Sequence, residues 1–250
     1  MKANAPDIRA ILFDKDGTLV DFNRTWFRVC MELAETAAGG DRDRAHLLME
    51  AAGYDFATAR FRADSVIGAG TVEELIDLWH PGLAAEERRD LIQAYDDHWV
   101  AEGSCRPIAL DGLRQSLEAL AGQGYLLGIA TNDSEAGAKG TAKALGIEAM
   151  FSCLLGYDSV ALPKPYPDML RHFAVTHGLE PHQIAMVGDN RHDLEMARAA
   201  GAGLAIGVLS GTGTAETLAP LADAVLASIS DLPAYIAGLV KPGFVEVEPT

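Results

Sequence analysis

Two carboxylates stand directly after a predicted strand. Asp14 and Asp16 follow the mostly apolar run 8–13 and precede Gly17. Such a run predicts a buried strand, and side chains two residues apart on an extended backbone point the same way. We therefore expect Asp14 and Asp16 to converge while Lys15 points aside. Paired acids at this position suit a hard divalent cation such as Mg²⁺ and a carboxylate nucleophile.

Three more predicted strands end in polar residues. Thr131 and Asn132 follow the apolar run 125–130, Lys164 stands between two prolines after the run 152–156, and Asp189 and Asp193 follow the run 183–187. In a parallel sheet the carboxyl ends of the strands meet at one edge, where ligands bind. The sequence therefore predicts that all four polar clusters lie on one rim.

The elements that must position these residues fall into two kinds. From residue 107 onward, apolar runs alternate with helical patterns, which predicts an α/β fold with a doubly wound parallel sheet. Between residues 20 and 106, helix-period segments dominate at 22–38, 41–53, 71–79 and 84–100. We predict a catalytic core over 1–19 and 107–250 and an inserted all-helical cap over 20–106.

Composition narrows the partners. The chain has 250 residues, 49% of them hydrophobic, and a formal net charge of −16 without a Lys/Arg run. Nucleic acid and anionic membrane surfaces are therefore poor partners. No apolar run approaches the ~20 residues of a membrane span, and the first residues have no apolar signal core. These observations favour a cytoplasmic location, and they are compatible with a monomer or a homodimer.

Together, the segments Asp14-Lys15-Asp16-Gly17-Thr18, Thr131-Asn132, Lys164-Pro165 and Gly188-Asp189 to Asp193 resemble the four motifs of the haloacid dehalogenase-like (HAD) phosphohydrolases, in the right order. The position of the insert resembles the C1-capped subgroup, which includes phosphoglycolate phosphatases. The resemblance implies that Asp14 is the nucleophile and forms an aspartyl phosphate. It also implies that Asp16 protonates the leaving oxygen and then activates water.

The same resemblance assigns the remaining roles. Thr131 would bind the phosphoryl oxygens with Asn132 beside it, and Lys164 would neutralise charge on the phosphate and on Asp14. Asp189 would bind Mg²⁺ together with the Asp14 carboxylate and the Asp16 main-chain carbonyl. Asp193 would lie behind these ligands or reach the ion through water.

The resemblance implies a small phosphorylated metabolite as substrate, either phosphoglycolate or a sugar phosphate. Charge and location make Arg24, Arg60, Arg62 and the loop 67–70 candidate cap contacts. A phosphotransferase resembling β-phosphoglucomutase is an alternative, because Asp16 serves both reactions. A noncatalytic binding module that kept the fold is a second alternative. A phosphonate hydrolase is disfavoured, since residues 21–105 contain no lysine for a Schiff base.

Overall fold

The computed structural model describes residues 6–62 and 65–239. The ends of the predicted core, residues 1–5 and 240–250, lie outside this part. A six-stranded parallel sheet forms the centre, in the order β5-β4-β1-β6-β7-β8. Its strands are β1 (Ala10–Phe13), β4 (Leu126–Ala130), β5 (Cys153–Leu155), β6 (Ile184–Gly188), β7 (Leu204–Val208) and β8 (Ala224–Leu226).

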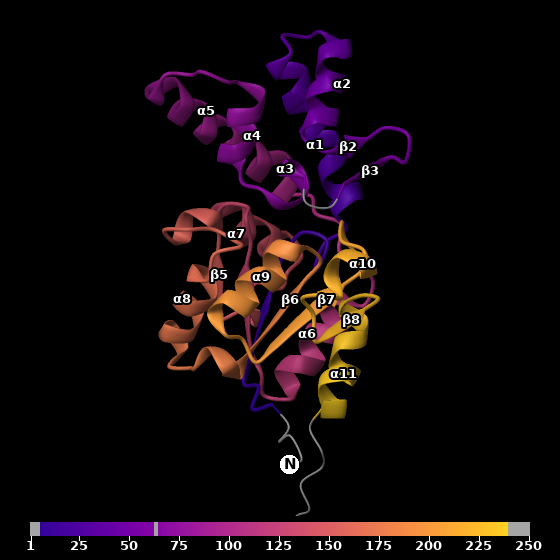
Figure 1. Cartoon of the computed structure of the whole chain (residues 1–250), viewed down its shortest axis with the longest axis vertical. Helices are drawn as coiled ribbons and strands as arrows, with labels where there is room; N and C mark the ends of the chain where they lie inside the picture. Colours follow the sequence, from indigo (N-terminus) through magenta and orange to yellow (C-terminus); the bar gives the residue numbers. More distant parts are fainter. Residues whose placement is uncertain (1–5, 63–64, 240–250) are drawn as a thin grey trace, which may run out of the picture.

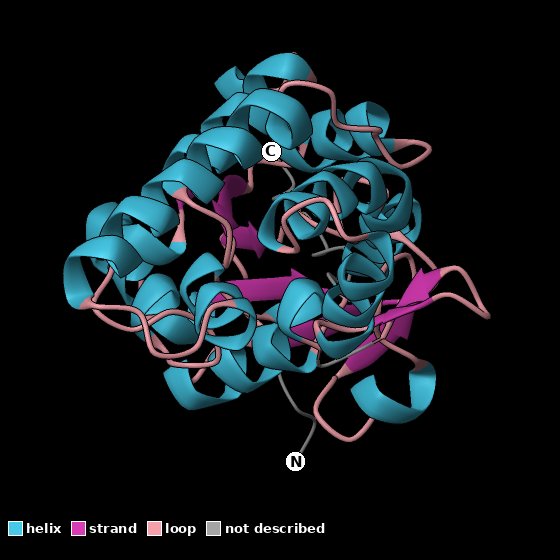
Figure 2. Ribbon diagram, turned by 90° about the horizontal axis from the view of Figure 1, so that it is seen from above, coloured by secondary structure: helices cyan, strands magenta, loops and turns pink. Residues whose placement is uncertain are grey.

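Helices cover both faces of this sheet (Figure 2). One face packs on α6 (Leu113–Gly122), α7 (Glu135–Ala144) and α11 (Leu232–Leu239). The other face packs on α8 (Asp168–His177), α9 (Arg191–Ala200) and α10 (Ala215–Leu218). Residues of β1 alternate between the two layers: Ile11 and Phe13 enter the first core, whereas Ala10 and Leu12 enter the second. The predicted doubly wound α/β sheet is confirmed.

The insert between β1 and β4 lies beyond the carboxyl ends of the strands (Figure 1). It has its own hydrophobic core, to which α1 contributes Trp26, Val29 and Leu33. Its helices are α1 (Phe22–Ala37), α2 (Arg42–Ala51), α3 (Val66–Ala69), α4 (Val72–Trp79) and α5 (Ala85–His98). We call this part the cap.

The cap differs from the prediction in two places. An antiparallel pair, β2 (Tyr54–Asp55) and β3 (Arg60–Phe61), shows that it is not all-helical. Each strand has two residues, too few to produce an alternating pattern in the sequence. The predicted helix 84–100 ends at His98 and continues as a π-helical turn, Trp99–Ser104, in which Gly103 packs against the Trp26 ring.

Short 3₁₀ helices join several of the core elements, at Glu148–Met150, Tyr157–Ser159, Pro181–Gln183 and Ile229–Asp231. Among the helices of residues 6–62 and 65–239, none has the length and apolar character needed to cross a membrane.

Candidate active site

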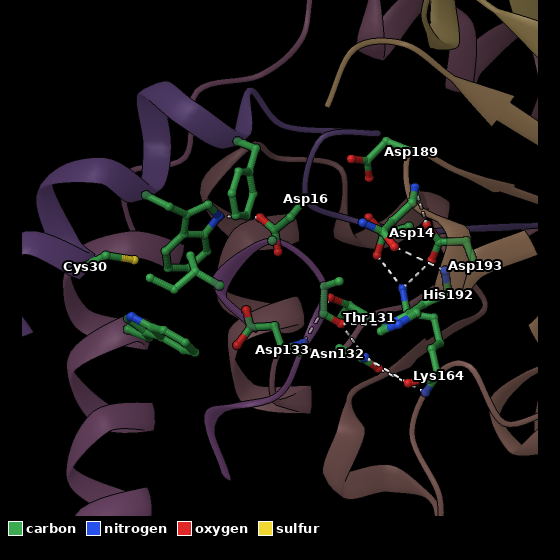
Figure 3. A pocket seen from close by; sticks show the side chains of 18 residues that line it. Asp14, Asp16, Cys30, Thr131, Asn132, Asp133, Lys164, Asp189, His192 and Asp193 are labelled. Carbon is green, nitrogen blue, oxygen red and sulfur yellow. Dashed lines mark hydrogen bonds and ion pairs between the residues drawn. The ribbon is translucent and has the colours of Figure 1, made fainter. Parts of the chain in front are cut away.

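The four polar clusters meet in one cavity of about 60 Å³ at the carboxyl edge of the sheet (Figure 3). This follows from strand order, because β5, β4, β1 and β6 are consecutive neighbours. The cavity is lined by every core residue singled out from the sequence, namely Asp14, Asp16, Thr131, Asn132, Lys164, Asp189 and Asp193. Residues up to 179 positions apart in the sequence, Asp14 and Asp193, thus face the same space.

Lys164 lies between two of these carboxylates. Its Nζ donates to Asp14 Oδ1 and to Asp193 Oδ1, each at 2.6 Å, and all three side chains are buried. Burial lowers the pKa of Lys164, but the two carboxylates outweigh burial and raise it overall. The ammonium group is therefore charged and fixed beside Asp14.

Three buried carboxylates surround the space next to this ammonium. Oxygen atoms of Asp14, Asp189 and Asp193 lie within 4.8 Å of one another. Burial raises the pKa of Asp14 to about 7, although Lys164 acts to lower it. The pKa of Asp189 is also raised, first by burial and next by the charge of Asp14. One lysine cannot balance three buried acids, and oxygen ligands of this kind suit a hard divalent cation. The cluster therefore fits a metal ion.

Asp189 is held in place by Thr212. Its Oδ2 accepts hydrogen bonds from Thr212 N at 2.7 Å and from Thr212 Oγ1 at 3.1 Å. Gly17 adopts a φ of +83°, and a Cβ there would lie 2.6 Å from Asp189 Cγ. The glycine after the two acids thus makes the turn and leaves room for the third acid.

Asp16 is bound by two donors. Trp26 Nε1 from the cap donates to its Oδ1, and Lys15 Nζ pairs with its Oδ2. Lys15 is fully buried, 4.8 Å from the centroid of the Trp26 ring and 3.0 Å from Asp133 Oδ2. Burial lowers its pKa, but Asp133 and Asp16 reverse this effect and raise it.

Lys15 points aside from the cavity, which it does not line, but it does not point away from Asp16. The strand ends at Phe13, and the next residues form a turn in which Leu19 N donates to Lys15 O at 2.8 Å. Alternation of side chains holds only while the backbone stays extended.

Thr131 and Asn132 contribute in different ways. Thr131 Oγ1 accepts from Asp133 N at 3.1 Å, so its hydroxyl hydrogen can still be donated into the cavity. Asn132 accepts from Lys164 N at 3.0 Å and donates to Lys164 O at 3.1 Å and to Ala69 O at 2.8 Å. Asn132 therefore fixes the Lys164 loop and connects it to the cap.

The arginines predicted as cap contacts do not line the cavity. Arg24 has 70% of its side chain exposed, and Arg60 and Arg62 are exposed as well. Arg62 Nη2 donates to Glu50 O at 2.7 Å, within the cap. Their location in the sequence was a poor guide because the cap turns these positions toward solvent. Of the predicted cap contacts, the loop 67–70 does line the cavity.

Seven lining residues were not predicted as site residues, namely Phe22, Trp26, Cys30, Trp99, Asp133, Asn190 and His192. Among them, Trp26 lies on α1 of the cap, Asp133 follows Asn132, and His192 precedes Asp193. His192 is half-buried, and its Nδ1 donates to Ala69 O at 3.2 Å. Asp133 and His192 are sequence neighbours of predicted site residues, and this adjacency could have indicated that they line the cavity. Trp26 carried none, because cap closure depends on tertiary contacts.

Comparisons with known proteins agree with this site. The haloacid dehalogenase-like hydrolase family matches residues 8–201. A phosphoglycolate phosphatase of Escherichia coli strain K12 is 30% identical over 238 residues, covering 90% of this chain and 91% of that protein.

Two solved structures share the fold. A haloacid dehalogenase-like hydrolase from Bacteroides fragilis has a TM-score of 0.72 at 21% identity, covering 90% of this chain and 99% of that chain. A predicted phosphoglycolate phosphatase from Haemophilus somnus has a TM-score of 0.69 at 24% identity, covering 92% and 98%. The sequence and the fold of the present chain both place it among the haloacid dehalogenase-like hydrolases, as a phosphatase.

Proposed function

We propose that this phosphatase hydrolyses a small phosphate monoester through an aspartyl phosphate on Asp14. The observation that carries the proposal is the convergence of Asp14, Asp189, Asp193 and Lys164 in one buried cavity. A nucleophilic carboxylate beside a fixed ammonium and a cation site is the set of groups that phosphoryl transfer needs.

The reaction divides into two steps. An Asp14 carboxylate oxygen bonds to phosphorus while the bond from phosphorus to the ester oxygen breaks, and Asp16 gives its proton to the departing alcohol. Water then attacks the phosphorus of the aspartyl phosphate and loses a proton to Asp16, which releases phosphate and restores Asp14. General acid–base help of this kind contributes about 10²- to 10⁴-fold, so electrostatic stabilisation must supply much of the remaining acceleration.

Three groups provide that stabilisation in the proposal. Lys164 offsets negative charge on Asp14 and on the phosphoryl oxygens, and Thr131 donates a hydrogen bond to them. Asp14, Asp189 and the Asp16 carbonyl would hold Mg²⁺, with Asp193 behind them. When bound, Mg²⁺ neutralises the charge of the phosphoryl group as it is transferred.

The substrate is proposed to be a small phosphorylated metabolite, and phosphoglycolate or a sugar phosphate is the type that the sequence predicts. The enzyme's location in the cytoplasm and its state as a monomer or homodimer are part of this proposal and are supported by the sequence alone.

The direct test is release of phosphate from p-nitrophenyl phosphate with Mg²⁺ and with EDTA. We expect turnover that EDTA abolishes, and we expect Asp14→Asn to reduce it at least ~10³-fold while circular dichroism shows an intact fold. Product analysis with glucose 1-phosphate separates hydrolysis from transfer to a sugar. A near-normal rate in Asp14→Asn would exclude Asp14 as the nucleophile.

A further inference from the structure

The cap closes the cavity with an apolar wall. Phe22, Trp26, Ile67 and Trp99 line it, and the rings of Trp26 and Trp99 meet edge to face with centroids 5.8 Å apart. The cavity measures about 60 Å³, against ~10–15 Å³ needed for one water. The space beside the phosphoryl group therefore holds only a few atoms, and its cap wall is apolar.

The charged side chains that line this space belong to the core, and the cap residues in the lining are uncharged. Among the lining residues that the structure describes, Lys164 and His192 are the side chains that can be cationic, and Lys164 is held by two carboxylates. His192 Nδ1 faces the Ala69 carbonyl, which can only accept, so Nδ1 carries a hydrogen that is already donated within the protein. Five carboxylates line the same cavity, those of Asp14, Asp16, Asp133, Asp189 and Asp193, and Lys15, Lys164 and the proposed Mg²⁺ offset their charge.

Backbone amides of the cap loop could in principle bind an anion, but they already have acceptors. Ile67 N donates to Ala52 O, Gly68 N to Ser65 Oγ, Ala69 N to Ser65 O, and Gly70 N to Val66 O, at 2.9–3.2 Å. The loop 67–70 therefore presents no free N–H to the cavity.

One neutral donor is left on the cap side. Trp99 Nε1 is buried and makes no hydrogen bond to any part of the chain that the structure describes. An indole N–H donates one hydrogen bond. It can serve a hydroxyl, ether or carbonyl oxygen, but one neutral donor is insufficient for a buried carboxylate.

We infer that the alcohol part of the substrate is compact and uncharged, with an apolar face and at most one or two hydrogen-bonding atoms. This inference rests on the proposed function, and it replaces phosphoglycolate and sugar phosphates as the expected substrates. Phosphate monoesters that carry a carboxylate on the alcohol, as phosphoglycolate does, are poor substrates of this enzyme, because the cap wall offers a second anion no cationic side chain and no free N–H of the loop 67–70.

The test compares three esters under one set of conditions with saturating Mg²⁺: 2-phosphoglycolate, its neutral amide, and n-propyl phosphate. The amide matches phosphoglycolate in size and differs in charge. We expect kcat/KM for both neutral esters to exceed that for phosphoglycolate by about 100-fold or more. Equal or faster hydrolysis of phosphoglycolate would overturn this inference and leave the phosphatase proposal standing. No phosphate from any of these esters or from p-nitrophenyl phosphate would contradict both.

A charge added to the wall tests the same point from the protein side. Ile67→Lys places an ammonium in the cavity and is expected to raise the ratio of kcat/KM for phosphoglycolate over propyl phosphate by at least about 10-fold. Leu78→Lys adds the same charge at an exposed cap position outside the cavity and should leave the ratio unchanged. An unchanged ratio in folded Ile67→Lys would count against the inference, and the wild-type comparison stands whether or not this variant folds.

Discussion

Lys15 is a single residue that connects two acids of different loops, Asp16 and Asp133. Its buried ammonium contacts Asp16 and Asp133 and lies over the Trp26 ring, and Trp26 in turn donates to Asp16. Asp16 is thereby fixed from below by the core and from above by the cap. The position of Lys15 could not be predicted from the sequence, because its direction depends on the turn that follows the strand.

Replacement of Lys15 should therefore destabilise the protein. In Lys15→Met, Asp16 and Asp133 lose their common cation, and removal of one partner from a buried pair costs about 3–5 kcal/mol. Urea denaturation should show a loss of that size, whereas Lys139→Met, at an exposed pair with Glu135, should change the free energy of unfolding by less than about 1 kcal/mol.

The double variant Lys15→Met/Asp133→Asn isolates the cause. It removes one of the two stranded acids, so it should recover part of the lost stability. A Lys15→Met protein as stable as the wild type would show that this buried network contributes nothing to folding.

At the scale of elements, Asp96 of α5 joins the cap to the core. Its Oδ2 accepts a hydrogen bond from Tyr157 OH at 2.8 Å. Burial raises the pKa of Asp96 from 3.8 to about 6; Tyr157 opposes this, whereas Asp133, Asp158 and Asp97 add to it. An acid with a higher pKa in the folded state binds its proton more tightly when folded. Its stabilising contribution is therefore present below pH ~4 and is lost as the pH rises through ~6.

Asp96→Asn should remove this pH dependence. The pKa difference would correspond to ~3 kcal/mol in a dry site, and we expect about 1 kcal/mol because water reaches part of the side chain. The variant should gain that much stability relative to wild type between pH 4 and pH 7.5 in urea denaturation. Asp97→Asn, at the adjacent exposed position, is the control. A difference that does not vary with pH would contradict the assignment.

Helices and strands were predicted from the sequence more fully than the contacts between the cap and the core. At the start of α4, Thr71 and Glu74 form a capping box, which is a local sequence signal for a helix N-terminus. The four strands that end in polar clusters were predicted, because buried parallel strands form apolar runs. The pair β2–β3 was missed because each strand has two residues. The wall formed by Trp26, Ile67 and Trp99 was missed because the way the cap closes on the core is not encoded in local patterns.

For the whole molecule, the buried acids should make stability depend on a cation. Mg²⁺ at 100 times its Kd would stabilise the folded state by about 2.7 kcal/mol, which corresponds to a rise in Tm of about 5–10 °C for a chain of this size. Because the chain carries a net charge of −16, NaCl at matched ionic strength must serve as the reference. Asp189→Asn should lose most of the Mg²⁺ response. An equal response in that variant would place the ion elsewhere.

The central claim is that Asp14 carries the phosphoryl group during turnover. The most direct measurement is to mix enzyme, Mg²⁺ and a hydrolysed phosphate ester, quench within one turnover, reduce with borohydride and locate the modified residue by mass spectrometry. Reduction converts an aspartyl phosphate to homoserine, so we predict homoserine at position 14, dependent on substrate and Mg²⁺. Release of phosphate in the first turnover with aspartate unmodified at position 14 would contradict the account.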